Sequence, residues 1–225
     1  MATLALRTIL KLSQRTGLRH SSPGSPAWAC PALAMILPIT KYGNPILRQK
    51  GARIEAITPD IHKLIEDMFE SMHAAGGIGL AAQQVGYALL LTVLDVRAVT
   101  DRKSILELDG ASADPNSIMP LVLINPEIKT SGLPATGPEG CLSFPEMYAD
   151  ISRPEWVEVN ALDAKEQRIA FKAGGLLGRA VQHEVDHLNG ILFIDRMSAK
   201  DKAALKPELD QLAAETKAAL QKKRG

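Results

Sequence analysis

The sequence predicts an α+β fold, with small mixed or antiparallel sheets around a central helix that carries a metal-binding motif. Apolar, strand-like runs occur in clusters, helical patterns lie apart from them, and a His-Glu-x-x-His pattern falls inside one helical run. The chain has 225 residues, 46% hydrophobic and 23% charged, which is enough for one domain with a sizeable core. This composition excludes collagenous, disordered and coiled-coil proteins. A net charge of +1 provides no general electrostatic attraction for nucleic acid or membranes, so neither is expected as a partner.

Residues 1–34 form a basic leader without a single acidic residue. Such a composition is typical of an import peptide for a mitochondrion or plastid. The alternative, which we favour, is that the leader is disordered or is not translated, with Met35 as the start of a bacterial cytoplasmic protein. Prolines interrupt the uncharged stretch 21–40, so it cannot form a membrane-spanning helix. With only Cys30 and Cys141, no disulfide framework is expected.

The first helix of the body is expected to begin at Pro59. Thr58 is a good N-cap residue and proline is favoured at the first helical position. Apolar residues follow at helical spacing, and the pair Gly76-Gly77 is expected to end the helix.

Two apolar runs, Tyr87–Val96 and Leu121–Ile124, predict buried strands. The polar stretch Asp101–Pro120 between them is expected to be a loop or insertion. Alternation of apolar and polar residues over 157–162 predicts a further strand with one wetter face.

The last part of the chain is expected to be helical. A helical pattern lies between Gly175 and Gly190, and Ser198 begins a capping-box pattern for a C-terminal helix over residues 198–225. Leucines recur on one stripe of that tail, and Pro207 is expected in its first turns or at a kink.

The strongest chemical signal is the sequence His183-Glu184-Val185-Asp186-His187. Residues four apart on a helix share a face, so both imidazoles can bind one metal ion, and Glu184 can reach a water on that metal. A catalytic site usually needs a third protein ligand. One class of metalloprotease has its third histidine at the position of Phe193, which cannot bind a metal. Cys141 is the other candidate ligand, although an isolated cysteine is more often a small, buried apolar residue.

Three segments together resemble the signature motifs of peptide deformylase. They are residues 77–84 (Gly-Ile-Gly-Leu-Ala-Ala-Gln-Gln), 139–143 (Glu-Gly-Cys-Leu-Ser) and 182–187 (Gln-His-Glu-Val-Asp-His). They occur in the order of the family, and the resemblance spans about residues 36–197. It implies a catalytic domain over residues 35–197.

The resemblance implies that Cys141, His183 and His187 bind one metal ion, with water as the fourth ligand. The family is known for Fe(II), with Zn(II), Ni(II) or Co(II) able to substitute, and this donor set suits such ions. The implied reaction is the removal of formate from N-formylmethionyl nascent chains. Glu184 is the expected general base, which later protonates the leaving amine.

Further roles follow from the same resemblance. The Leu142 backbone N–H and the Gln84 amide are expected to donate to the formyl oxygen. The substrate is expected to add as a strand along Gly77-Ile78, and Arg153 to organise the substrate cleft.

Glu139 and Gln182 are expected to orient the metal ligands. Asp186 is equally compatible with a solvated helix face and with a supporting hydrogen bond. Bacterial members of the family dock on ribosomes through a C-terminal helix, and the basic tail is compatible with such docking.

Two other functions compete with deformylation. The first is an endopeptidase that uses the His-Glu-x-x-His motif, which the absence of a downstream ligand disfavours. The second is a non-catalytic binding protein stabilised by a metal ion. Glu184 and Gln84 argue against this second alternative, because a purely structural site needs neither of them.

Overall fold

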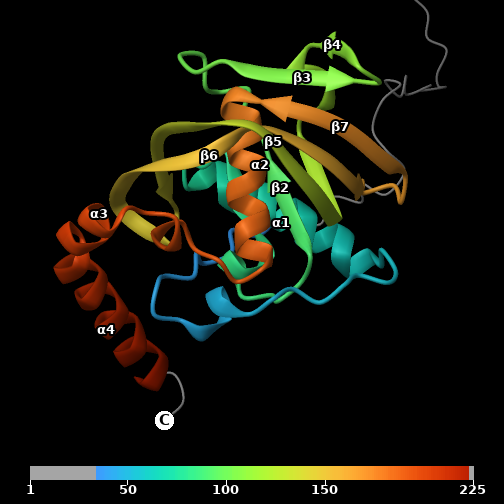
Figure 1. Cartoon of the computed structure of the whole chain (residues 1–225). Helices are drawn as coiled ribbons and strands as arrows, with labels where there is room; N and C mark the ends of the chain where they lie inside the picture. Colours follow the sequence, from blue (N-terminus) through green and yellow to red (C-terminus); the bar gives the residue numbers. More distant parts are fainter. Residues whose placement is uncertain (1–33, 223–225) are drawn as a thin grey trace, which may run out of the picture. The chain divides into compact units, whose positions relative to one another are not determined.

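The computed structural model describes residues 34–222, so the predictions for the leader, including Cys30, lie outside the described residues (Figure 1). The helices and strands are α1 (Pro59–Ala74), β1 (Gly79–Ala81), β2 (Leu91–Leu94), β3 (Ser104–Leu108), β4 (Ala111–Ala113), β5 (Leu121–Cys141), β6 (Phe144–Leu162), β7 (Arg168–Gly174), α2 (Gly175–Leu188), α3 (Ala199–Ala204) and α4 (Lys206–Lys222). Short 3-10 helices are η1 (Pro45–Arg48), η2 (Ala82–Val85), η3 (Pro115–Ile118) and η4 (Phe193–Asp195).

The strands form one seven-stranded sheet in the order β1-β2-β5-β6-β7-β3-β4. Every neighbouring pair is antiparallel. The prediction of antiparallel strands and helices is therefore confirmed, but there is a single sheet in place of several small ones. The reason is the length of β5 and β6, at 21 and 19 residues. Register shifts between them let the pair bend, and the pair joins β2 on the side of β5 to β7 on the side of β6.

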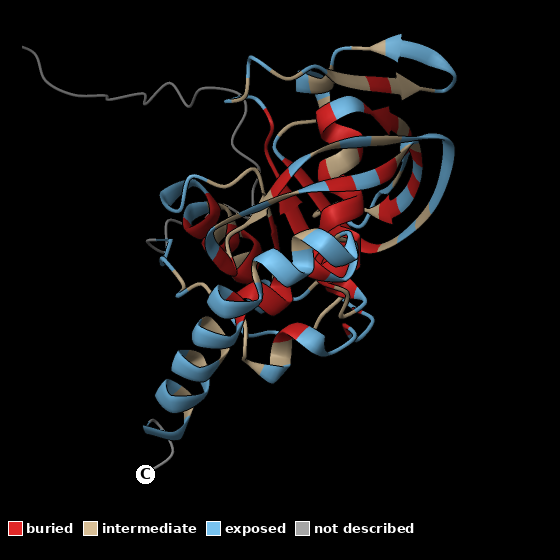
Figure 2. Cartoon of the chain, turned by 60° about the vertical axis from the view of Figure 1, so that its left-hand side comes forward, coloured by how far each residue is buried: buried red, intermediate tan, exposed pale blue. Residues whose placement is uncertain are grey.

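Helix α2 is the central element of the fold. It contacts β1, β2, β3, β6 and β7, and Figure 1 shows it crossing the curved sheet. All of its residues except Gly175 and Arg179 are buried, as the red ribbon in Figure 2 shows. A helix buried on almost every side can hold polar groups in a fixed position, which is what a functional site requires.

The first predicted helix is confirmed as α1. The Thr58 hydroxyl accepts a hydrogen bond from the Ile61 N–H at 3.4 Å, and Pro59 occupies the first helical position. Just beyond the C-terminal end of α1, Gly76 adopts the left-handed conformation with φ +67°. α1 packs against β1 and β2 and thereby supports the segment that leads into the 77–84 motif.

The prediction of a loop over residues 101–120 is wrong. The segment contains the hairpin β3–β4 and the short helix η3. Its turn is formed by Asp109 and Gly110, both left-handed with φ of 49° and 77°, as in a two-residue hairpin of type I′. Because Leu106 is the only buried residue of this segment, the apolar pattern of a strand is weak there.

The other predicted strands differ mainly in length. β2 is shorter than the run 87–96, because Tyr87 is 47% exposed and the chain enters the sheet only at Leu91. β5 continues far beyond the predicted end at Ile124. The alternation over 157–162 is confirmed within β6, where Val157 and Val159 are buried.

The predicted C-terminal helix is divided into α3 and α4. Ser198 caps α3 as predicted, accepting from the Asp201 N–H at 3.1 Å. Pro207 lies in the first turn of α4, where its missing N–H is tolerated. α4 is exposed over most of its length in Figure 2, and Leu209 is its one buried residue within the described chain. Over residues 34–222, no helix is both long and apolar enough to cross a membrane.

Candidate metal centre and active site

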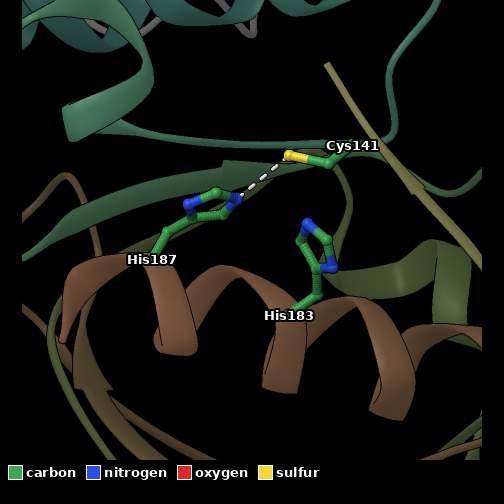
Figure 3. Close-up of side chains that lie close together, drawn as sticks. All are labelled: Cys141, His183 and His187. Atoms are coloured by element: carbon green, nitrogen blue, oxygen red, sulfur yellow. Dashed lines mark hydrogen bonds between the residues drawn. The ribbon is translucent and has the colours of Figure 1, made fainter. Parts of the chain in front are cut away.

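The three predicted metal ligands lie together in the structure. Cys141 is the last residue of β5, and His183 and His187 lie one turn apart on α2. Figure 3 shows both imidazoles rising from one side of α2 toward the cysteine sulfur. The Cys141 Sγ is 3.2 Å from His187 Nε2, and the candidate ligand atoms of all three residues lie within 4.8 Å of one another.

This donor set fits a tetrahedrally bound transition metal. Ligand bonds of about 2.0–2.3 Å separate the ligand atoms of such a site by about 3.5 Å. The Nδ1 atom of His183 is 3.1 Å from the Glu139 carboxylate, which fixes the ring and leaves Nε2 for an ion. A thiolate and two imidazoles match Zn(II), Fe(II) and similar ions better than Mg(II) or Ca(II), which prefer oxygen ligands.

Glu139 is the centre of a buried ion network. Its carboxylate accepts hydrogen bonds from Arg153 at 2.6 and 2.9 Å and from Arg179 at 2.8 Å. Burial alone would raise the pKa of Glu139, but the hydrogen bonds with His183 and Arg153 outweigh it and hold the pKa well below its usual range. Glu139 is therefore ionised and can keep His183 oriented.

The network continues from Arg153 to Asp186 and the protein surface. Arg153 donates to Asp186 at 2.8 Å, and Arg196 donates to the same carboxylate at 2.7 and 3.2 Å. Of the two environments expected for Asp186, the structure has the supporting one, since its side chain is only 10% exposed. The arginines compensate the buried carboxylates, which would otherwise be costly to bury.

Glu184 lies beside the ligand cluster and is 4% exposed. Its carboxylate packs against Gly79, where a Cβ atom would lie only 2.4 Å from Oε1. The second glycine of the 77–84 motif is thus required to make room for Glu184. Burial raises the pKa of Glu184 to about 7. A carboxyl group with this pKa can both accept and release a proton at neutral pH.

The Gln84 side chain is also directed at the cluster. Its Oε1 accepts from the Ala81 N–H at 2.8 Å, and its Nε2 is 3.5 Å from the Cys141 sulfur and 3.3 Å from the Ser143 hydroxyl. Leu142, the residue after the cysteine, lies in the turn between β5 and β6. The two predicted donors to a formyl oxygen therefore flank Cys141.

A cavity of about 570 Å³ opens onto Cys141, Leu142, His183 and Glu184. Gly77 and Ile78 line it together with Cys141 and Leu142. A Cβ atom on Gly77 would lie 2.7 Å from the Leu142 side chain, so the glycine allows Leu142 to approach its backbone. The cavity is large enough for a side chain and part of a peptide.

Two predicted residues have other surroundings than expected. Arg153, which was expected to organise the substrate cleft, is 4% exposed, and its guanidinium is occupied by Glu139 and Asp186, so it does not reach the cleft itself. Gln182 donates to the backbone carbonyl of Pro154 at 3.0 Å and so joins α2 to β6, without a hydrogen bond to a ligand histidine.

Two further residues of the site were not predicted. Arg179 precedes His183 by one helical turn, so the spacing of four residues on one face could have revealed it. Lys41 also lines the cavity, and nothing in its sequence surroundings signals this position.

Known proteins resemble this chain in both sequence and fold. A sequence profile for polypeptide deformylase matches residues 36–203. The chain belongs to the peptide deformylase family. It is 44% identical over 178 residues to the peptide deformylase of Methylacidiphilum infernorum, covering 79% of this chain and 93% of that protein. It is 42% identical over 187 residues to the enzyme of Opitutus terrae, covering 82% and 97%.

The solved structures include a peptide deformylase from Synechococcus elongatus in complex with actinonin. It superposes with a TM-score of 0.66 at 39% identity, covering 76% of this chain and 87% of that one. Members of the family are metal-dependent hydrolases that remove the N-terminal formyl group from nascent polypeptides, which is the activity of this chain. The resemblance seen in the three sequence motifs is thereby confirmed.

Proposed function

We propose that this deformylase hydrolyses its substrate at a metal ion held by Cys141, His183 and His187, with Glu184 as the proton carrier. The observation that carries the proposal is the clustering of these ligand atoms within 4.8 Å beside the buried Glu184, at the wall of a cavity. We expect Fe(II) as the physiological ion, with Zn(II), Ni(II) or Co(II) able to replace it. When bound, the ion acts as a Lewis acid and lowers the pKa of a nucleophilic water.

Glu184 accepts the proton of the attacking water and delivers it to the leaving amine. Its place against Gly79 holds the carboxylate beside the ligand cluster. Gln84 Nε2 and the Leu142 N–H donate to the formyl oxygen, on which negative charge develops. Loss of one such donor typically costs about 3–4 kcal/mol of transition-state stabilisation.

The substrate is the N-formylmethionyl end of a nascent chain. Its backbone pairs with Gly77-Ile78 as an added strand, a common mode of peptide recognition. Ile39, Leu142 and Leu176 contribute apolar side chains to the cavity, which suits a methionine side chain. Arg153 acts indirectly, since its guanidinium is occupied in holding Glu139 and Asp186.

The cellular setting is part of the proposal. The catalytic domain spans residues 35–197, and the family match over 36–203 supports this range. α4 packs on this domain through Leu209, and the exposure of its other residues leaves it available for docking on the ribosome. The relatives are bacterial-type enzymes, which favours action in the bacterial cytoplasm over import into an organelle.

Formate release from a formyl-Met tripeptide tests the proposal. The protein is prepared anaerobically with Fe(II), beside Glu184→Ala and the matched control Glu70→Ala, which removes an exposed carboxylate from α1. The parent and the control are expected to turn over, while Glu184→Ala loses about 10³-fold in kcat and keeps its metal.

Two outcomes would contradict the proposal. A folded, metal-loaded parent that releases no formate would rule out the reaction at this site. A Glu184→Ala enzyme that retains parental kcat would exclude Glu184 as the proton carrier. Cleavage of internal peptide bonds in unformylated peptides would point instead to an endopeptidase.

A further inference from the structure

A three-residue segment, Thr40–Tyr42, joins the two parts of the chain that carry the proposed formyl-oxygen donors. At one end the Thr40 N–H donates to the Gln84 carbonyl at 2.7 Å. At the other end the Tyr42 N–H donates to the Ser143 carbonyl at 3.0 Å. One short segment thus contacts both η2 and the turn between β5 and β6.

Lys41, the middle residue of this segment, reaches the same turn through its side chain. Its ammonium group donates to the Leu142 carbonyl at 2.8 Å. A charged donor makes this bond stronger than one between neutral groups. Leu142 and Ser143 are the two central residues of the turn, and the orientation of the peptide between them is what differs most between turn types. Lys41 therefore holds the peptide between Leu142 and Ser143, which directly follows the peptide that carries the Leu142 N–H.

Direct contacts between the two donor segments are weaker by comparison. Gln84 Nε2 is 3.3 Å from Ser143 Oγ, which is longer than a typical N–H···O bond, and 3.5 Å from Cys141 Sγ, which is a weak acceptor. The three bonds that join the 40–42 segment to η2 and to the turn are all 3.0 Å or shorter. The spacing of the donors consequently depends more on this segment than on their direct contact.

The 40–42 segment is itself anchored on both sides. Ile39 packs with the apolar cluster that includes Leu142. The Tyr42 ring stacks on Phe144, the residue that follows the turn, with the ring centroids 4.8 Å apart. An anchored segment can transmit its geometry to the turn, which a mobile one could not.

We propose that Lys41 is a positioning residue for deformylation, which sets the Leu142 turn relative to Gln84 so that both donors meet the formyl oxygen. This inference rests on the proposed function, because it assigns Lys41 a role through those two donors. Preorganised donors stabilise the transition state only when they already point to where charge develops. Lys41 therefore acts on kcat and leaves the binding of the peptide ground state largely unchanged.

The test compares Lys41→Met, which keeps the length of the side chain but loses its charge and donor, with Lys41→Arg, which keeps both. Lys165→Met is the matched control, because it removes an exposed lysine from the turn between β6 and β7. The readouts on the Fe(II) enzymes are kcat and KM for a formyl-Met tripeptide, metal content and Tm. We expect Lys41→Met to lower kcat about tenfold, with KM within about twofold and metal content and Tm as in the parent. Lys41→Arg should recover most of the lost kcat, and Lys165→Met should equal the parent.

Three results would overturn the inference. They are an unchanged kcat in Lys41→Met, a raised KM at constant kcat, which would place the lysine on the bound peptide, and a Lys41→Arg enzyme as slow as Lys41→Met. Each result is read against the parent enzyme. A parent without formate release would instead contradict the proposed function, so the two failures are distinguishable.

Discussion

The helices α2 and α4 have similar lengths, at 14 and 17 residues, and both carry apolar residues at helical spacing. Their environments are opposite. α2 is buried on almost every side and contacts five strands, whereas α4 buries Leu209 alone among its described residues. Of these two helices, only α2 holds ionisable groups out of water, and Arg153 and Arg196 compensate the charge of one of them, Asp186. The difference teaches that a helical pattern locates a helix, while packing on the sheet makes it a site for chemistry.

Removing one leucine from each helix tests this contrast most strongly. Leu177→Ala on α2 creates a cavity beneath the sheet and is expected to lower the free energy of unfolding by about 2–5 kcal/mol. Leu209→Ala on α4 is expected to release that helix locally, with turnover of a tripeptide unchanged. Chemical denaturation measures the first effect, and hydrogen exchange over residues 206–222 the second. Equal losses of global stability would mean that the two helices are integrated into the core to the same degree.

Crowding the α2 carboxylate gives the next largest effect. In Gly79→Ala the new methyl group would lie 2.4 Å from Glu184 Oε1, so the carboxylate must move. A displacement of about 1 Å typically costs about 100-fold in rate, so kcat should fall by this order while the metal stays bound. Gly137→Ala is the control, because its nearest neighbour would be 3.4 Å away. A Gly79→Ala enzyme with parental kcat would show that Glu184 does not depend on this space.

Glu139→Gln tests how far a residue outside α2 supports the metal ligand His183. The variant keeps the shape of the side chain but loses the charge that orients His183. Metal affinity is expected to fall about tenfold, measured by competition with a coloured chelator. Glu158→Gln, an exposed position on β6, serves as the control. A metal affinity equal to that of the parent would show that the ion network around Glu139 does not contribute to metal binding.

The smallest effect is expected for an ion pair away from both helices. Hydrogen bonds from Arg97 hold the pKa of Asp95 below its ordinary value of 3.8. The ionised form therefore stabilises the fold above the unfolded pKa, and this contribution is lost as the pH falls through the lower folded pKa. Asp95→Asn should be slightly less stable than the parent near pH 6, and the difference should shrink toward pH 3. Tm measured on metal-free protein avoids a contribution from metal release at low pH, and a constant difference would contradict the assignment.

Much of the site could be predicted because its signals are local. The spacing of His183 and His187 places them on one helix face, and Thr58 with Pro59 marks the start of α1. The hairpin β3–β4 was missed although Asp109-Gly110 is a strong turn signal. Its strands bury only Leu106, so the apolar pattern that usually identifies a strand is almost absent.

The remaining features depend on contacts between distant parts of the chain. Two such contacts can be seen only in the folded structure. Gly79 makes room for Glu184, and Lys41 reaches Leu142. Burial likewise determines what the Arg153 guanidinium can bind. On the surface the same side chain would be free to contact a substrate. A sequence pattern records the periodicity of each element but not what lies across from it.

The site draws Gln84 from η2, Cys141 from the end of β5 and both histidines from α2, which follows β7 in the chain. Contacts between residues so far apart in the sequence form late, because the entropy cost of closing a long loop comes before the stabilising contacts are made. No fragment that stops before α2 can contain the complete site. During refolding, formate release should therefore return only after the last step in the assembly of the native state. Spectroscopic signals of helix formation should appear earlier than formate release.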